Sequence, residues 1–386
     1  MTDIHSIKLA LSARARSLGA VAVGVSSAQT DSAVQARLRA AIARGDLATW
    51  RYEEHHAQSL SDPTQLLSGA QSVFCLALPY GHPAPRAPRG AGLVSSYVWG
   101  HDYHRVMRGV LDALLAEIAG AAPLARAIAV CDTKPLAERA FAARAGLGWV
   151  GKHTNLIVPG VGSYVFLGEI VTDLALEPDQ PRKTHCGSCQ RCIVACPTGA
   201  LRGDYTMDAT RCIADLTQRR DAIPRELRPL IGSWIWGCDL CQNACPPVAR
   251  AKPQGLAAFA PGPTPYPDLL ELLASSSAEL QRRYAQSAMV WRGASVLRRN
   301  AAVALGNERD RASVPGLARA LVHDGSALVR AHVAWALGRI ASPAALDALR
   351  AAWQREPNAD VRTEIEEAIG DISGLPCVQA IMEDEG

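Results

Sequence analysis

The sequence predicts a multidomain protein of the α/β plus α class, with an N-terminal α/β domain, a cysteine-rich segment and a C-terminal helical solenoid. Apolar strand-like and helical stretches alternate up to about residue 175. Eight of the eleven cysteines lie between residues 186 and 245, and a helical motif recurs from residue 298 onward. A chain of 386 residues suggests two or three domains, and we place them at residues 1–175, 176–255 and 265–386.

The composition limits the classes of protein to consider. Hydrophobic residues make up 48% and charged residues 20%, so the chain can bury a sizeable core. The net charge of +3 excludes a strongly basic nucleic-acid coat but allows a local basic patch. The sequence has neither a long uncharged apolar run nor the apolar stretch of a secretory signal near residue 1. We therefore expect a cytoplasmic protein without a membrane span.

The N-terminal region contains the elements of an α/β domain. Residues 72–78, 127–131 and 164–172 are expected to form strands, and residues 105–119 and 136–145 helices. Asp132 follows a predicted strand, and open α/β sheets bind ligands where strands end. The alternative is that Asp132 or Thr133 caps the helix that begins near Pro135.

The cysteine spacing is typical of two-cluster bacterial ferredoxins. A first set is spaced x2, x2 and x3 and ends in Cys-Pro, and a second set, spaced x2 and x3, also ends in Cys-Pro. Cys212, between the sets, can supply the ligand that the second set lacks. The predicted ligands of one [4Fe–4S] cluster are Cys186, Cys189, Cys192 and Cys245. Those of the other are Cys196, Cys212, Cys238 and Cys241.

Other uses of the cysteines fit less well. CxxC pairs also bind zinc, but the Cys-Pro endings and the ferredoxin spacing argue against two zinc sites. A secreted disulfide scaffold would be shorter and would carry an export signal. Cys75, Cys131 and Cys377 lie in apolar contexts, where we expect buried, inert thiols.

The C-terminal region repeats every 32 residues. Residues 298–306, 330–338 and 362–370 each have Arg first, Ala seventh, Leu or Ile eighth and Gly ninth. The fourth and eighth positions lie on one helical face, and the glycine suits a helix C-terminus. Three units in one register argue against chance similarity between Ala-rich helices. The pattern predicts a short solenoid of HEAT type.

Five segments together resemble the epoxyqueuosine reductases, cobalamin-dependent iron–sulfur enzymes of tRNA modification. They are residues 99–104 (Trp-Gly-His-Asp-Tyr-His), Asp132 with Glu138-Arg139, residues 146–153, the eight cysteines and residues 297–307. The resemblance covers most of the chain. It departs from the family at residues 213–215 (Ile-Ala-Asp instead of Ile-Ser-Tyr) and lacks an expected arginine near Leu60.

The resemblance implies a function for each region. The N-terminal domain would bind cobalamin, the cysteine segment would pass it electrons from an external donor, and the repeats would dock tRNA. The reaction would reduce epoxyqueuosine at the wobble position to queuosine, the last step of queuosine biosynthesis. The enzyme would be a monomer. The alternatives are a cobalamin-dependent reductive dehalogenase, which would usually carry a twin-arginine signal, and a non-catalytic electron-transfer scaffold.

The resemblance also implies roles for individual residues. Asp132 matches the proton donor. The residues expected around the substrate are Asp102, Tyr103, His104, Arg139 and His153. Those expected to contact cobalamin are Ser95, Trp99, Asn155, Leu156 and Ser163. The side chains expected to contact tRNA phosphates are Arg292, Arg298 and Arg299, with Arg282 and Arg283 close in sequence.

Overall fold

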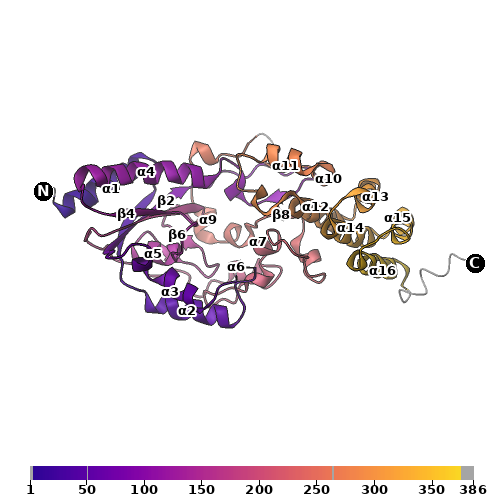
Figure 1. Ribbon diagram of the computed structural model, residues 1–386, viewed down its shortest axis with the longest axis horizontal. Coiled ribbons are helices and arrows are strands. Elements are labelled where there is room, and N and C mark those ends of the chain that lie inside the picture. The colour runs from indigo at the N-terminus through magenta and orange to yellow at the C-terminus, as the bar shows by residue number, and fades with distance from the viewer. Residues whose placement is uncertain (1–2, 50, 263–264, 375–386) are drawn as a thin grey trace, which may run out of the picture. The chain divides into compact units, whose positions relative to one another are not determined.

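The computed structural model describes residues 3–49, 51–262 and 265–374. Their backbone forms two compact units (Figure 1). The first comprises the described residues of 1–84, 96–212 and 239–261. The second comprises those of 85–95, 213–238 and 262–386. Among the described residues, none of the helices is both long enough and apolar enough to cross a membrane.

The first unit is built on a four-stranded sheet of order β1-β2-β7-β4 in which every neighbouring pair is antiparallel. Its strands are β1 (Ala22–Ser27), β2 (Ser72–Pro79), β4 (Ala127–Val130) and β7 (Val165–Thr172). All eight residues of β2 are buried, because this strand is central and helices cover both faces of the sheet. The strands predicted from the sequence are confirmed to within one residue at each end.

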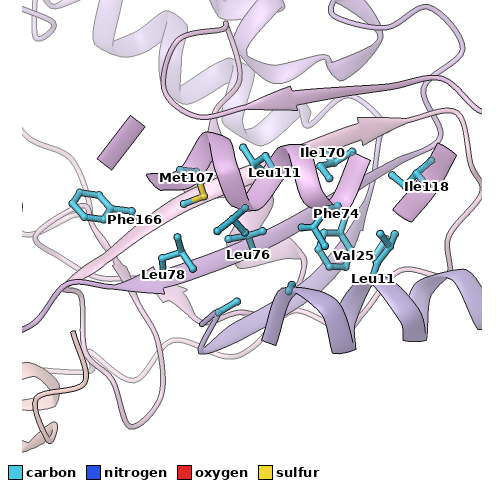
Figure 2. Close-up of a cluster of buried hydrophobic side chains, with 14 of the residues drawn as sticks. Leu11, Val25, Phe74, Leu76, Leu78, Met107, Leu111, Ile118, Phe166 and Ile170 are labelled. Carbon is cyan, nitrogen blue, oxygen red and sulfur yellow. The ribbon is translucent and has the colours of Figure 1, made fainter. Parts of the chain in front are cut away.

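Helices pack on both faces of this sheet. On one face, Leu11 of α1 (Ile4–Ser17) and Leu111 of α4 (Tyr103–Ala121) join a core with Phe74 and Leu76 of β2 (Figure 2). On the other, α5 (Glu138–Arg144) packs Phe141 against the sheet. The remaining elements of this unit are α2 (Ser32–Ala43), α3 (Glu54–Ser61), β5 (Trp149–Val150), β6 (Leu156–Ile157), α6 (Arg191–Val194), α8 (Leu240–Asn243) and α9 (Pro246–Arg250).

The second unit is mainly helical. Its helices are α7 (Ile213–Leu216), α10 (Leu269–Ala274), α11 (Ser277–Arg283), α12 (Ala294–Glu308), α13 (Val314–His323), α14 (Ala327–Ile340), α15 (Pro343–Trp353) and α16 (Ala359–Ser373). A short parallel pair joins β3 (Leu93–Val94) to β8 (Trp234–Trp236). The three repeats of the sequence form α12, α14 and α16, and the same ion pair recurs between them. Arg298 pairs with Asp324 at 2.7 Å, and Arg330 pairs with Glu356 at 2.8 Å.

The repeat glycines lie inside helices, so the expectation that they end them is wrong. Gly306 lies within α12 and Gly338 within α14, and these helices end instead at Arg309 and Ala341, both left-handed. A Cβ atom at Gly306 would lie 2.8 Å from Ala336 Cα, and one at Gly338 would lie 2.8 Å from Ala368 Cβ. The glycines therefore allow the helices of successive repeats to approach closely.

Candidate active site

Asp132 occupies the turn that follows β4. Its backbone is left-handed (φ 47°), a conformation that Asp tolerates better than most residues. The N-cap of α5 is Ala137, and the structure of this turn shows no side-chain cap there. The capping alternative for Asp132 and Thr133 is therefore wrong. The carboxyl group of Asp132 points to other partners.

Two side chains from the start of α4 hold this carboxyl group. The Tyr103 hydroxyl donates a hydrogen bond to Asp132 Oδ2. His104 Nε2 lies 2.9 Å from Asp132 Oδ1, and His104 Nδ1 lies 2.7 Å from Asp102 Oδ1. Asp102 also caps α4 by accepting a bond from the His104 backbone N–H at 3.0 Å. The cap thus fixes the position of the two residues that reach Asp132.

The pKa shifts of Tyr103 and His104 favour the protonated forms, in which both side chains are hydrogen-bond donors. The hydrogen bond to Asp132, and then that to Asp102, raises the pKa of His104 to about 9, so the imidazole is charged at neutral pH. Burial and the neighbouring Asp132 carboxylate raise the pKa of Tyr103, so its phenol keeps its proton. The Asp132 side chain itself is 47% exposed. It is therefore an accessible carboxyl group held by two hydrogen-bond donors.

Glu138 holds the backbone of the turn that contains Asp132. Its Oε1 accepts a hydrogen bond from the Asp132 backbone N–H. Burial raises the pKa of Glu138 to about 7, and the Asp132 carboxylate contributes in the same direction. Sequence reasoning placed Glu138 in a matching motif but gave it no role. The next residue, Arg139, donates from Nη1 to the Thr154 carbonyl oxygen at 2.9 Å.

His153 is buried and neutral. Burial lowers its pKa to about 4, and its Nδ1 accepts from the Asn155 backbone N–H at 3.3 Å. The ring proton therefore lies on Nε2, which has no hydrogen-bond partner among the described residues. Within the same described part of the chain, Ser96 Oγ and Trp149 Nε1 are also buried without partners.

The residues expected to contact cobalamin each have different contact partners, and the described structure does not bring them together through shared contacts. Ser163 Oγ is buried and donates to Gln242 Oε1 at 2.9 Å. The Trp99 backbone N–H bonds Ser96 O at 3.3 Å, and that of Ser95 bonds Trp236 O at 2.8 Å within the second unit. Leu156 is buried in β6.

Seven of the eight cysteines predicted as cluster ligands lie in the first unit. Burial raises the pKa of the Cys245 thiol to about 11, and the neighbouring thiols of Cys186, Cys192 and Cys189 add to the shift. Burial raises that of Cys241 to about 12, and the neighbouring groups Cys212, Asp239, Cys192 and Cys196 add to the shift. Cys192 belongs to the other predicted ligand set, so the division of these thiols into two sets stays a prediction from their spacing. Cys238 belongs to the second unit. Across the described ranges, no three His, Cys, Asp or Glu side chains are placed to hold a single metal ion.

Other thiols and one lysine complete the description of this region. Cys75 is buried as expected, Cys131 is half-buried, and burial raises the pKa of both thiols. Cys377 lies outside the described residues. Lys152 was not predicted to have a role, and its ammonium donates to Gly187 O at 2.8 Å and Cys189 O at 3.1 Å. It thus places a positive charge on the first cysteine loop.

The arginines expected to contact tRNA differ in accessibility. Arg299 is fully buried and donates to the carbonyl oxygens of Leu216, Arg219 and Asp221, so it does not fit the expected phosphate contact. Its guanidinium instead holds the segment that follows Cys212. Arg298 is mostly buried in its ion pair with Asp324.

Arg292 lies 3.8 Å from the ring centroid of Trp291, whose side chain is 51% exposed. Arg282 and Arg283 line an open cavity of about 600 Å³ with Glu271 and Glu279. Arg283 forms an ion pair with Glu271. Acidic side chains therefore share this cavity with the two arginines.

Comparisons with known proteins agree with this arrangement. Three family models match: "Epoxyqueuosine reductase QueG, DUF1730" at residues 61–133, "4Fe-4S double cluster binding domain" at 185–247 and "HEAT repeats" at 292–370. The chain is 36% identical over 322 residues to an epoxyqueuosine reductase of Bacillus anthracis, which covers 82% of this chain and 84% of that protein. It is 40% identical over 313 residues to that of Gloeobacter violaceus, with coverage of 78% and 96%.

Solved structures of such enzymes match most of the chain. The crystal structure of an epoxyqueuosine reductase with an epoxyqueuosine-modified tRNA-Tyr stem loop is similar with a TM-score of 0.91 and 34% identity, over 96% of this chain and 100% of that one. The enzyme from Streptococcus thermophilus is similar with a TM-score of 0.87 and 31% identity, over 95% and 99%. The predicted fold class is thereby confirmed. The chain belongs to the epoxyqueuosine reductase family and is an oxidoreductase.

Proposed function

We propose that this protein reduces epoxyqueuosine at the wobble position of tRNA to queuosine, the last step of queuosine biosynthesis. The observation that carries the proposal is the Asp132 carboxyl group, exposed and held by Tyr103 and His104, in a chain of this family. A relative solved with an epoxyqueuosine-modified tRNA-Tyr stem loop supports tRNA as the substrate. The family relatives give no support to a dehalogenase or to a non-catalytic scaffold.

Two [4Fe–4S] clusters are proposed as electron carriers. The double-cluster family model supports iron–sulfur clusters in residues 185–247, and the thiols that neighbour Cys245 and Cys241 all belong to the eight predicted ligands. Four thiolates per cluster match the usual ligation of such clusters. An external donor would supply the electrons, and the clusters would pass them on one at a time.

Cobalamin is proposed as the second cofactor. Bound cobalamin supplies a strongly reducing cobalt centre for opening the epoxide. The chain offers polar atoms that suit such a group: Ser96 Oγ and Trp149 Nε1 are buried and lack partners in the described structure. The other proposed contacts are Ser95, Trp99, Asn155, Leu156 and Ser163.

The chain's own residues would handle the protons. Removing the epoxide oxygen as water requires acid at that oxygen, and Asp132 is positioned to give it a proton. Tyr103 and the charged His104 then stabilise the carboxylate that remains. Asp102 keeps the imidazole oriented. Arg139 and His153 are proposed to line the substrate side of the site.

Each region would have a distinct task. Residues 1–175 would form the catalytic cobalamin domain, 176–255 the cluster domain and 265–386 the tRNA-docking repeats. A base with a bulky modification must leave the stack to reach the acid. We propose that the enzyme works as a monomer in the cytoplasm.

Mass analysis of tRNA nucleosides tests the proposal. Reconstituted protein is incubated with reductant, cobalamin and tRNA that carries epoxyqueuosine, and the expected product is queuosine. If epoxyqueuosine persists although the protein holds its full iron and cobalamin, the proposal is contradicted. Halide release from a halogenated aromatic, without tRNA turnover, would favour the dehalogenase.

A further inference from the structure

Residues 213–237 of the second unit form a linking segment between two predicted ligands of the same [4Fe–4S] cluster. Cys212 immediately precedes the linking segment, and Cys238 immediately follows it. The cysteine spacing assigns both thiols to the second ligand set. Because a cluster is bonded to all four of its cysteines at once, the two ends of the linking segment have to be held in fixed positions.

The hydroxyl group of Thr217 joins the two ends of the linking segment. It donates to the Ile213 carbonyl oxygen at 2.8 Å, and it accepts from the Gly237 backbone N–H at 3.0 Å. Ile213 is the residue after Cys212, and Gly237 is the residue before Cys238. Thr217 and Gly237 are both buried, so water cannot take over these bonds. One side chain therefore sets the separation between the neighbours of two predicted ligands.

The backbone of Gly237 depends on this contact. Its φ of 67° lies in the left-handed region, which glycine adopts without a steric cost. Glycine also has the most conformational freedom to lose on folding, so a contact is needed to keep it in one conformation. The hydrogen bond from its N–H to Thr217 provides that contact. It thereby fixes the direction in which the chain continues from β8 to Cys238.

Two buried side chains of α12 hold Thr217 in place. Arg299 donates to the Leu216 carbonyl oxygen at 2.9 Å. Asn300 Nδ2 donates to the carbonyl oxygens of Thr217 and Ile235, at 2.7 Å in each case. Asn300 Oδ1 in turn accepts from Arg299 Nε at 3.0 Å. Asn300 thus ties the two ends of the linking segment together through the backbone, as Thr217 does through its hydroxyl group.

We propose that Thr217, Asn300 and Arg299 are positioning residues for the second cluster. They fix the two ends of the linking segment so that the thiols of Cys212 and Cys238 bind one [4Fe–4S] cluster. This inference rests on the proposed function, in which that cluster carries electrons. It gives the first repeat of the solenoid a task in holding a cluster, and it gives Arg299 a role that its burial allows.

Removal of the Thr217 hydroxyl group tests the inference. Thr217→Val keeps the shape of the side chain but leaves the buried Gly237 N–H without its acceptor. After anaerobic reconstitution, a chelator should remove about half of the iron roughly tenfold faster than from wild-type protein, and the other half at the wild-type rate. The electron paramagnetic resonance signal that Cys241→Ala loses should be altered in Thr217→Val. Wild-type iron release from folded Thr217→Val would overturn the inference.

Two further threonine variants separate positioning from a general effect on folding. Thr217→Ser restores the hydroxyl group and should restore the wild-type rate of iron release and the wild-type signal. Thr363→Val removes a hydroxyl group that also donates to the carbonyl oxygen four residues before it, but in α16, and it should leave iron release unchanged. If Thr217→Ser releases iron as fast as Thr217→Val, the hydroxyl group is not the cause and the inference is overturned.

Asn300→Ala and Asn307→Ala form a second matched pair, which decides the question if Thr217→Val does not fold. Both asparagines lie on α12, and each donates through Nδ2 to two carbonyl oxygens of the linking segment. Asn307 reaches Arg228 and Gly232, which do not adjoin a predicted ligand. Asn300→Ala should accelerate iron release about tenfold, and Asn307→Ala should not. Equal release from the two variants would overturn the inference.

The iron content of wild-type protein distinguishes this inference from the proposed function. If reconstituted wild-type protein holds no [4Fe–4S] cluster, the proposed electron transfer fails and the inference fails with it. If wild-type protein holds about eight iron atoms and converts epoxyqueuosine, while every variant releases iron at the wild-type rate, only the positioning role is removed.

Discussion

Asp132 combines an unusual backbone conformation with a tightly specified environment. A left-handed backbone is unfavourable for most residues and persists where the surroundings over-determine it. Here the surroundings are the hydrogen bonds to Tyr103 and His104 and the acceptance of its backbone N–H by Glu138. The carboxyl group is thus aimed by contacts from two helices.

Asp132→Asn should reduce turnover while the protein still folds and binds tRNA. Asn also tolerates the left-handed conformation and still accepts from Tyr103, so the variant should keep the fold, the iron content and tRNA binding, with a lower melting temperature because the ion pair with His104 is lost. Turnover should fall about 10²- to 10⁴-fold, since the acid is lost. Single-turnover assays with nucleoside analysis measure this loss. Undiminished turnover would remove Asp132 as the proton donor.

The raised pKa of His104 predicts that the stability of the fold depends on pH. Its folded-state pKa of about 9 lies above the ordinary value of 6.5, so its contribution is complete below about pH 6.5 and is lost as the pH rises through about 9. His104→Gln should therefore lower the melting temperature at pH 6, and the difference from wild type should shrink towards pH 9.5. A difference that stays constant with pH would show that the charge of His104 does not stabilise the fold.

The resemblance to a known family grouped residues 102–104 with Asp132 in one site, and hydrogen bonds join them although His104 and Asp132 lie 28 residues apart. Glu138 was given no role, because only the fold brings its carboxyl group to the Asp132 backbone N–H. Arg298 and Arg299 look alike in sequence, but adjacent helical residues point in different directions, so one forms an ion pair and the other is sealed inside.

Among the helices, the side-chain contacts of one repeat recur 32 residues later, as the sequence motif does. The acids Asp324 and Glu356 each accept from an arginine of the repeat and from a backbone N–H two residues later, at 2.8 Å and 3.0 Å respectively. The sequence predicted β2, β4 and β7 but not β1, and it indicated no pairing direction; all neighbouring pairs of this sheet are antiparallel. The role of the repeat glycines could not be read from the sequence, because it depends on the distance to the next helix.

Gly338→Ala should destabilise the solenoid although alanine favours helices. The new Cβ would lie 2.8 Å from Ala368 Cβ and 3.1 Å from its Cα, so α14 and α16 must separate. We expect a loss of about 1–3 kcal/mol in the free energy of unfolding of the second unit. Gly109→Ala in α4 is the matched control, since nothing lies within 4 Å of its added Cβ. That change should stabilise by about 0.5–1 kcal/mol. Denaturant unfolding measures both, and stabilisation by Gly338→Ala would contradict the packing argument.

For the whole molecule, the proposed cluster ligands make a prediction about iron content. Cys241→Ala should reduce the iron content from about eight to about four atoms per chain, because only the second ligand set loses a member. Cys75→Ala is the control, since this thiol is buried in the sheet core and should leave the iron content unchanged. Metal analysis after anaerobic reconstitution gives both values. Full iron content in Cys241→Ala would contradict the proposed ligand sets.

The charge of residues 265–386 limits where the proposed tRNA contact can lie. This region carries 13 basic and 16 acidic side chains. Arg298 and Arg330 of this region form the repeat ion pairs, and Glu364 contacts Arg225 of the preceding segment. Of the three arginines expected from the sequence to contact tRNA, Arg299 is buried, and Arg292 is the one beside an exposed aromatic ring, that of Trp291. A cation on an aromatic ring suits both phosphate contact and base stacking.

Arg292→Ala should therefore weaken binding of an epoxyqueuosine tRNA stem loop and reduce the slope of log K against log salt by about one. Arg319→Ala, an exposed arginine on α13, is the matched control and should change neither value. Binding titrations at several salt concentrations measure both variants. Equal effects of the two changes would mean that the repeats attract tRNA only through diffuse charge. An effect confined to Arg292 would place the contact at the N-terminal side of α12, where the solenoid begins.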